Sequence, residues 1–141
     1  AIFKRGRELN LRPLSVVVVE PGAKVKLFKK EDGSSELRFE MAMGKAYASL
    51  AMGRSSSLVR VRAEQRPMFM DFLMRASDGQ IFPEGGGMLI RGADGALMGA
   101  VGVTGDTQEM DEELAAQGIR AAGLLTDDDA AALGVEVRIE N

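Results

Sequence analysis

The spacing of apolar and polar residues predicts two β-hairpins. Leu14 to Glu20 contains four consecutive valines, a β-branched run typical of a buried strand. Lys24 to Lys29 alternates lysine with apolar residues after a Pro-Gly turn, which predicts a partner strand with one face in water. Gly87 to Arg91 and Ala96 to Val103 predict the second hairpin, around an Ala-Asp-Gly turn.

Helical spacing follows each hairpin. Residue spacing predicts a helix over Glu36–Met52, and Gly53 can end it. This helix is rich in small residues, which suggests close packing on a sheet or on a neighbouring subunit. Pro67 suits the first turn of a short helix through Ala76. The polar segment 54–65 between them carries no clear pattern.

The two ends of the chain also carry patterns. Residues 1–9 resemble the end of a helix, so we expect the beginning of that helix to be missing. Asp106 and Glu109 have the form of a capping box for a helix through about Ala122. A short helix follows from Thr126 until Gly134, and alternation over 135–139 predicts a final strand or extended tail.

The order hairpin, helices, hairpin, helix predicts an α+β fold. Such an order favours an antiparallel sheet with helices gathered on one side. The sequence shows no repeat and no linker, so residues 1–141 are expected to form a single domain. Aromatic residues make up only 5%, so aliphatic side chains and nine methionines must fill the core. We expect Met41, Met68 and Met98 on buried faces.

Composition excludes several kinds of function. The formal net charge is −3 and there is no basic stripe, which argues against a nucleic-acid partner. The four arginines at positions 54, 60, 62 and 66 are expected in a solvated loop. Without cysteine or histidine there is no disulfide, thiol nucleophile, serine–histidine triad or typical zinc site, so no metal is expected. No apolar run approaches the ~20 residues of a membrane span, and we expect a cytoplasmic protein without a membrane partner.

Two glycine-rich segments are candidates for a ligand site. Gly85, Gly86 and Gly87 would let backbone amides approach an anionic group, although a bulge or a tight entry into a strand explains them equally well. Thr104 offers a hydroxyl, and Gly105 and Asp106 offer amides at a helix start, which suits a carboxylate. The alternative is an ordinary strand-to-helix turn with a local hydrogen bond.

Three ionisable residues are candidates for charge or catalysis. Lys45 would supply a cation for an anionic ligand, or else its stem packs on the core while its head reaches water. Glu40 and Asp106 would move a proton if the protein is an enzyme, but Asp106 is favoured more strongly as a helix cap. The sequence alone does not assign a catalytic residue.

Several motifs together resemble the GlcG/HbpS family, which includes the C-terminal domain of PduO-type proteins. They are Val-Val-Val-Val-Glu-Pro-Gly at 16–22, Ala-Met-Gly-Lys-Ala-Tyr-Ala at 42–48, Gly-Gly-Gly-Met-Leu-Ile at 85–90 and Met-Gly-Ala-Val-Gly-Val-Thr-Gly at 98–105. The resemblance spans roughly Leu9 to Ala122. It implies a profilin-like α+β fold, with helices flanking a five-stranded antiparallel sheet, and a homo-oligomer, often an octamer. Some members bind haem and are linked to haem sensing or degradation.

The resemblance also shapes the expected function. This chain differs from the family pattern at two positions, since the family often has Asp where Glu20 stands and Pro where Leu89 stands. It also has no histidine, so haem would be held by Tyr47, by a methionine or by pocket contacts alone. We expect a small-ligand-binding protein whose pocket lies near the Gly-rich hairpin at a subunit interface, with a small carboxylate or haem as ligand. One alternative is a lyase or isomerase acting on a hydroxy or oxo acid through Lys45 and a carboxylate, and another is an accessory subunit without a ligand.

Overall fold

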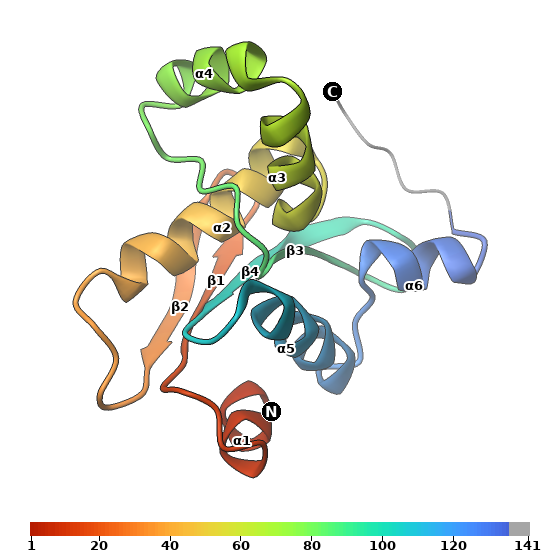
Figure 1. The fold of residues 1–141 in the computed structure, drawn as a ribbon. Helices are drawn as coiled ribbons and strands as arrows, with labels where there is room; N and C mark the ends of the chain where they lie inside the picture. The colour runs from red at the N-terminus through yellow and green to blue at the C-terminus, as the bar shows by residue number, and fades with distance from the viewer. Residues whose placement is uncertain (136–141) are drawn as a thin grey trace.

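A four-stranded antiparallel sheet forms the centre of the computed structural model, which describes residues 1–135 (Figure 1). The strands are β1 (Ser15–Glu20), β2 (Lys24–Lys30), β3 (Gly87–Arg91) and β4 (Leu97–Thr104), in the order β2-β1-β4-β3. The helices are α1 (Ile2–Glu8), α2 (Arg38–Met52), α3 (Ser56–Gln65), α4 (Pro67–Ala76), α5 (Gln108–Ala121) and α6 (Asp127–Ala132). The predicted α+β class, with helices flanking an antiparallel sheet, is confirmed.

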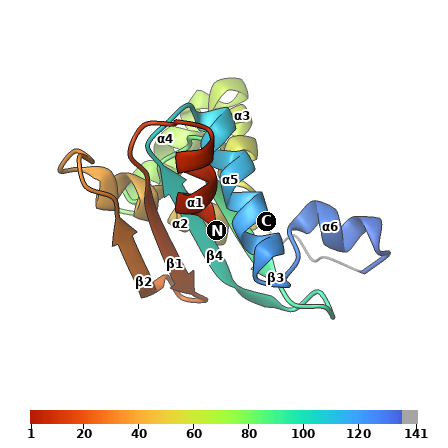
Figure 2. The same ribbon diagram turned by 90° about the horizontal axis from the view of Figure 1, so that it is seen from below.

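Helices cover both faces of the sheet, and not one side as the sequence suggested. Helix α2 packs on one face, while α5 and α1 lie on the other (Figure 2). The valine run of β1 explains the difference, because Val17 and Val19 pack with α2 whereas Val16 and Val18 face α5. A strand that is apolar on both faces needs cover on both.

The expected strand count was wrong for the described residues, which form four strands and not five. The final strand predicted over 135–139 lies outside the described residues, apart from Val135. The profilin-like assignment stays a prediction.

Helix α2 lies directly against the backbone of β3 and β4. A Cβ atom at Gly102 would overlap the carbonyl group of Ala42, and one at Gly87 would overlap the carbonyl group of Lys45. The helix residues that face this contact are small, and Ala42 and Ala46 are fully buried. The small-residue helix therefore packs closely on the sheet.

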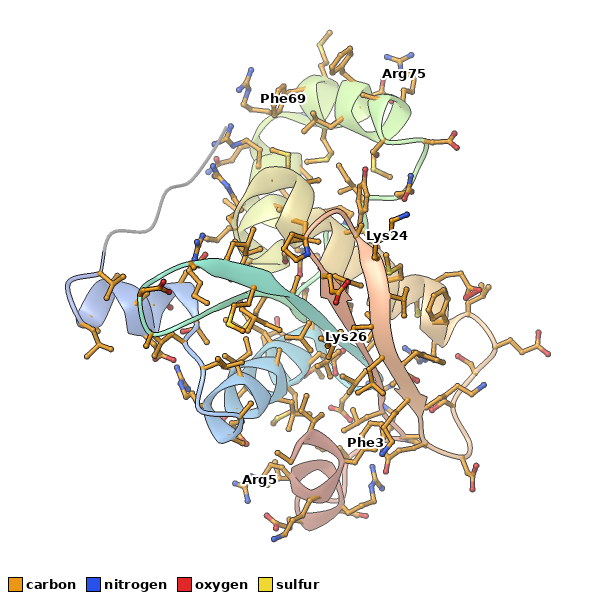
Figure 3. The ribbon with its side chains drawn as sticks, turned by 180° about the vertical axis from the view of Figure 1, so that it is seen from behind. Phe3, Arg5, Lys24, Lys26, Phe69 and Arg75 are labelled. Atoms are coloured by element: carbon orange, nitrogen blue, oxygen red, sulfur yellow. The ribbon has the colours of Figure 1, made fainter. Side chains whose placement is uncertain are left out.

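A helical pair, α3 and α4, projects from the sheet (Figures 1 and 3). Residue spacing did not predict α3, because arginines separate its apolar side chains. The solvated loop expected for this segment was wrong, since Arg60 and Arg62 lie in α3. Arg62 of α3 and Arg66, which follows the helix, lie over the ring of Phe69, and the Arg66 guanidinium carbon is 4.4 Å from the ring centroid. The prediction that Met68 and Met98 are buried was wrong, since they are 87% and 51% exposed.

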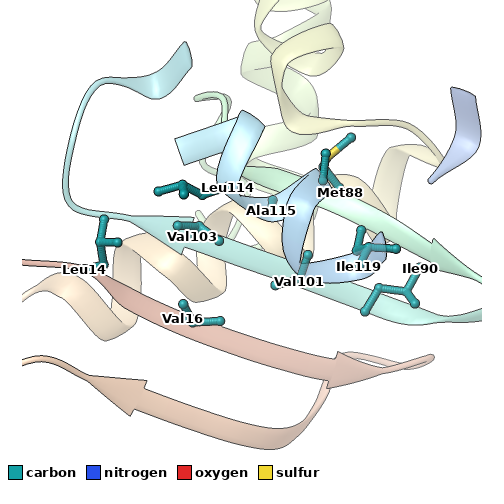
Figure 4. Close-up of a cluster of buried hydrophobic side chains, with 10 residues drawn as sticks. Leu14, Val16, Met88, Ile90, Val101, Val103, Leu114, Ala115 and Ile119 are labelled. Atoms are coloured by element: carbon teal, nitrogen blue, oxygen red, sulfur yellow. The ribbon is translucent and has the colours of Figure 1, made fainter. Parts of the chain in front are cut away.

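The core on the α5 side is aliphatic (Figure 4). Leu114, Ala115 and Ile119 of α5 pack on Val101 and Val103 of β4. Among residues 1–135, no helix is both long and apolar enough to cross a membrane. The same residues contain no group of three or more acidic, histidine or cysteine side chains suited to a metal ion.

Candidate functional site

Lys45 and Asp111 form an ion pair inside the protein. The Lys45 Nζ atom lies 3.0 Å from Asp111 Oδ2 and donates to the Val103 carbonyl oxygen at 2.9 Å. Both side chains are almost fully buried, at 4% and 1% exposed. Burial lowers the pKa of Lys45, and the Asp111 carboxylate opposes that shift. The pair joins α2, β4 and α5 at one point.

The second Asp111 oxygen fixes the turn between β4 and α5. Asp111 Oδ1 accepts a hydrogen bond from the Asp106 amide at 3.0 Å. The cap of α5 is Thr107, whose hydroxyl accepts from the Met110 amide at 3.2 Å, so the prediction of Asp106 as the cap was wrong by one residue. The Asp106 carboxylate makes other hydrogen bonds instead.

The Asp106 carboxylate holds the segment before β1 against this turn. It accepts from the Arg12 amide at 3.1 Å and from the Thr107 amide at 2.9 Å. The hydrogen bond from Thr107 is the main cause of the lowered pKa of Asp106, and the Arg12 amide adds to it. A carboxyl with a lowered pKa is a weak base, which does not suit proton abstraction.

Acid should weaken this turn. The folded-state pKa of Asp106 lies below its ordinary value of 3.8, so the unfolded chain binds this proton at higher pH than the folded chain. The stabilisation is therefore complete well above pH 3.8 and is lost as the pH falls through the folded-state pKa. We expect Asp106→Asn to lower the free energy of unfolding in urea more at pH 7 than at pH 3. An equal loss at both values would contradict this.

The three adjacent glycines already have internal contacts. The Gly85 amide donates to Gln108 Oε1 at 3.0 Å, and the Gly87 amide donates to Ser56 Oγ at 2.8 Å. Gly86 has a φ of 129°, and a Cβ atom there would overlap the Val103 carbonyl oxygen and lie 3.0 Å from Lys45 Nζ. The described contacts thus give these glycines a packing role, and their role in ligand binding stays a prediction.

Thr104 ends β4 beneath the first turn of α2. Its side chain is buried, with only 3% of the residue exposed. Its Oγ1 accepts from Arg38 Nη1 at 3.2 Å and lies 3.9 Å from Met41 Sδ. Arg38 also donates to Ser35 Oγ and Met41 Sδ. None of the carboxylates within residues 1–135 pairs with the Arg38 guanidinium.

Ser15 completes this group of side chains. It pairs directly across the sheet with Thr104 and is fully buried. Its hydroxyl has no hydrogen-bond partner within the described part of the chain, and a buried polar group without a partner is costly. We call Ser15, Arg38, Met41 and Thr104 the Thr104 cluster. It combines a half-buried cation with two buried hydroxyls, an arrangement suited to a carboxylate.

Sequence reasoning found Thr104 but missed Arg38 and Ser15. The position of Arg38 could have indicated a functional role. A cation in the first turn of a helix interacts unfavourably with the helix dipole, so another interaction is expected to hold it there. Ser15 gave a weaker signal as the hydroxyl that opens a valine strand. Glu40, a catalytic candidate, lies exposed on α2, while Lys45 is enclosed and Asp106 is held by Arg12.

Comparison with known proteins establishes the family. The family model described as "Haem degrading protein HbpS-like" matches residues 1–120, so the chain belongs to the HbpS-like family and the resemblance given by the sequence motifs is confirmed. No curated protein matches the chain.

Several solved structures share the fold. A PduOC:heme complex is 23% identical with a TM-score of 0.78, covering 89% of this chain and 88% of that chain. Protein ORFY of Klebsiella pneumoniae is 22% identical with a TM-score of 0.76, covering 86% and 82%. HbpS is 24% identical with a TM-score of 0.72, covering 86% and 81%. These likenesses support the fold.

Proposed function

We propose that this protein binds a small anionic molecule at the Thr104 cluster, namely haem or another tetrapyrrole, or a small carboxylate. The observation that carries the proposal is Arg38, a guanidinium without a carboxylate partner among residues 1–135, beside the buried hydroxyls of Ser15 and Thr104. Arginine and carboxylate form charge-assisted, often bidentate hydrogen bonds. An incoming carboxylate would neutralise the cation and give Ser15 a partner.

The family and its relatives favour haem within this class. The matching family is described as haem-degrading, and one of the similar structures is a heme complex. Haem carries two propionate groups, which fit Arg38 and the hydroxyls chemically. When bound, haem would supply its iron and an apolar ring. With no histidine in the chain, Met41 is the methionine at this cluster, whereas Tyr47 packs with α3 and α4.

The other predicted site residues receive supporting roles in this proposal. Lys45 holds the end of β4 to α2 and α5 through Asp111. Gly85, Gly86 and Gly87 bring β3 close to that pair, and Gly105 and Asp106 fix the turn next to Thr104. Ligand contact is assigned to Thr104, Arg38 and Ser15.

We also propose a homo-oligomer, an octamer or similar assembly, in which a second subunit completes the pocket. In such an assembly the second subunit would cover Leu37, which is 62% exposed directly beside Arg38. The predicted cytoplasmic location remains part of the proposal. The lyase or isomerase alternative lacks support, because Lys45 is closed off from solvent and Asp106 is a weak base.

Titration with haemin tests the proposed function. We expect a shift of the Soret band on binding, and an increase of about tenfold in Kd for Arg38→Gln, the effect of losing one charge-assisted hydrogen bond. Thr104→Val should weaken binding less, and Met41→Leu should alter the spectrum.

The matched control is Arg75→Gln, which removes an exposed arginine paired with Asp71 on α4. It should bind haemin as the unmodified protein does. If haemin gives no Soret shift, small carboxylates become the test ligands by calorimetry. Unchanged affinity of Arg38→Gln for every ligand that binds would overturn the proposal.

A further inference from the structure

A hollow opens on the opposite face of the sheet from the Thr104 cluster. Helix α5 covers β3 and β4 there, and α1 lies beside it, but none of the helices within residues 1–135 lies over β2 on this face (Figure 2). The result is a cavity of about 420 Å³, within the range typical of small-molecule sites.

The walls of this cavity are almost entirely apolar. Phe3 of α1 lies between its helix and the strands (Figure 3). Val18 and Leu27 form the floor from two neighbouring strands, where they pair across the sheet, and Ile119 closes the side under α5. Leu27 remains 49% exposed, so solvent reaches the floor. Exposed apolar surface in a concave site favours an apolar ligand.

Lys29 is the one charged side chain among the residues that line the cavity. It pairs with Val16 across the sheet and therefore points to the same face as Leu27. Within residues 1–135 no carboxylate forms an ion pair with it, whereas Lys26 on the opposite face of β2 pairs with Glu20 at 3.2 Å. A lysine stem lies along apolar surface while its ammonium group stays at the rim. The cavity thus combines an apolar interior with a lysine at its edge that is unpaired in the described part of the chain.

We propose that this cavity binds an amphipathic carboxylate, such as a fatty acid of medium chain length. Its hydrocarbon chain lies against Phe3, Val18, Leu27 and Ile119, and its carboxylate meets the ammonium group of Lys29. Lys29 selects an acid over a neutral lipid, because no aspartate or glutamate among the lining residues opposes a negative headgroup. The site lies apart from Arg38 and Thr104 and does not rest on the function proposed for them.

Fluorescence of 11-(dansylamino)undecanoic acid tests the site. We expect enhanced, blue-shifted emission when the probe binds the full chain, and displacement of the probe by decanoate. Lys29→Gln should raise the Kd of decanoate by about tenfold, as expected for the loss of one charge-assisted contact, and leave that of decanol unchanged. Lys24→Gln, an exposed lysine on the same strand outside the cavity, is the matched control and should behave as the unmodified protein.

Two further variants separate the possible outcomes. Val18→Phe fills the floor and should abolish probe binding while circular dichroism shows an unchanged fold. Arg38→Gln should bind the probe normally, so that failure of the haemin experiment and failure of this one are distinguishable. The proposal is overturned if the probe does not bind, as when a second copy covers this face, or if Lys29→Gln binds decanoate as tightly as the Lys24→Gln control.

Discussion

Replacing Gly102 with valine is expected to prevent the protein from folding. A Cβ atom at this position would overlap the Ala42 carbonyl group and lie 3.2 Å from the Ala46 amide nitrogen. These atoms belong to the backbone of α2, so no side-chain rotation relieves the overlap and the helix must move away from the sheet. Overpacking a core with flexible side chains typically costs about 1–3 kcal/mol and occasionally more. Here the overlap is with the helix backbone and valine adds two further methyl groups, so we expect a loss close to the total stability of roughly 5–15 kcal/mol.

A graded pair of variants measures this effect. Gly102→Ala should still fold but lose about 3 kcal/mol in the free energy of unfolding, measured in urea. Gly123→Ala is the control, because a Cβ atom there meets nothing within 4 Å and only the positive φ of 77° is strained. That strain costs roughly 1–2 kcal/mol. A Gly102→Ala protein as stable as the unmodified chain would show that α2 does not press on β4 as described.

Replacing Lys45 with methionine should cause the second large loss. Methionine fills similar space but leaves the Asp111 carboxylate buried without its cation. Breaking one side of a buried ion pair costs about 3–5 kcal/mol, because the remaining charge stays out of water. Lys26→Met breaks an exposed pair with Glu20 and should cost less than about 1 kcal/mol.

The double variant Lys45→Met with Asp111→Leu separates charge from packing. Removing both charges should restore part of the stability lost in Lys45→Met, because apolar residues often replace a buried ion pair without loss. Recovery should be incomplete, since the Asp106 amide also loses its acceptor. A double variant no more stable than Lys45→Met would mean that the buried charge of Asp111 is not the cause of the loss.

The fold was largely predictable because its signals are local. The valine run, the Pro-Gly turn and the small residues before Gly53 each predicted an element that the structure contains. The segment 54–65 was not predictable as α3, because its arginines hide the apolar spacing and part of its cover comes from α4. The burial of Met68 was misjudged because the apolar stripe of α4 predicts a helix but does not show which of its side chains another element covers.

The candidate site was less predictable because its contacts join distant parts of the chain. Lys45 was recognised as a notable cation, but its partner Asp111 lies 66 residues later and no spacing rule connects them. Arg38 and Thr104 are likewise 66 residues apart, and Ser15 reaches Thr104 only through strand pairing. The three glycines at 85–87 were recognised as unusual in the sequence. Close packing and ligand binding would both require glycine there, so the sequence alone does not distinguish a packing role from a binding role.

A crystal structure of the protein grown with haemin decides whether the Thr104 cluster is the ligand site. We expect a porphyrin propionate within hydrogen-bonding distance of the Arg38 guanidinium and the Thr104 hydroxyl, on the α2 face of the sheet. A porphyrin bound elsewhere, with Arg38 still donating to Thr104, would show that this cluster does not hold the ligand.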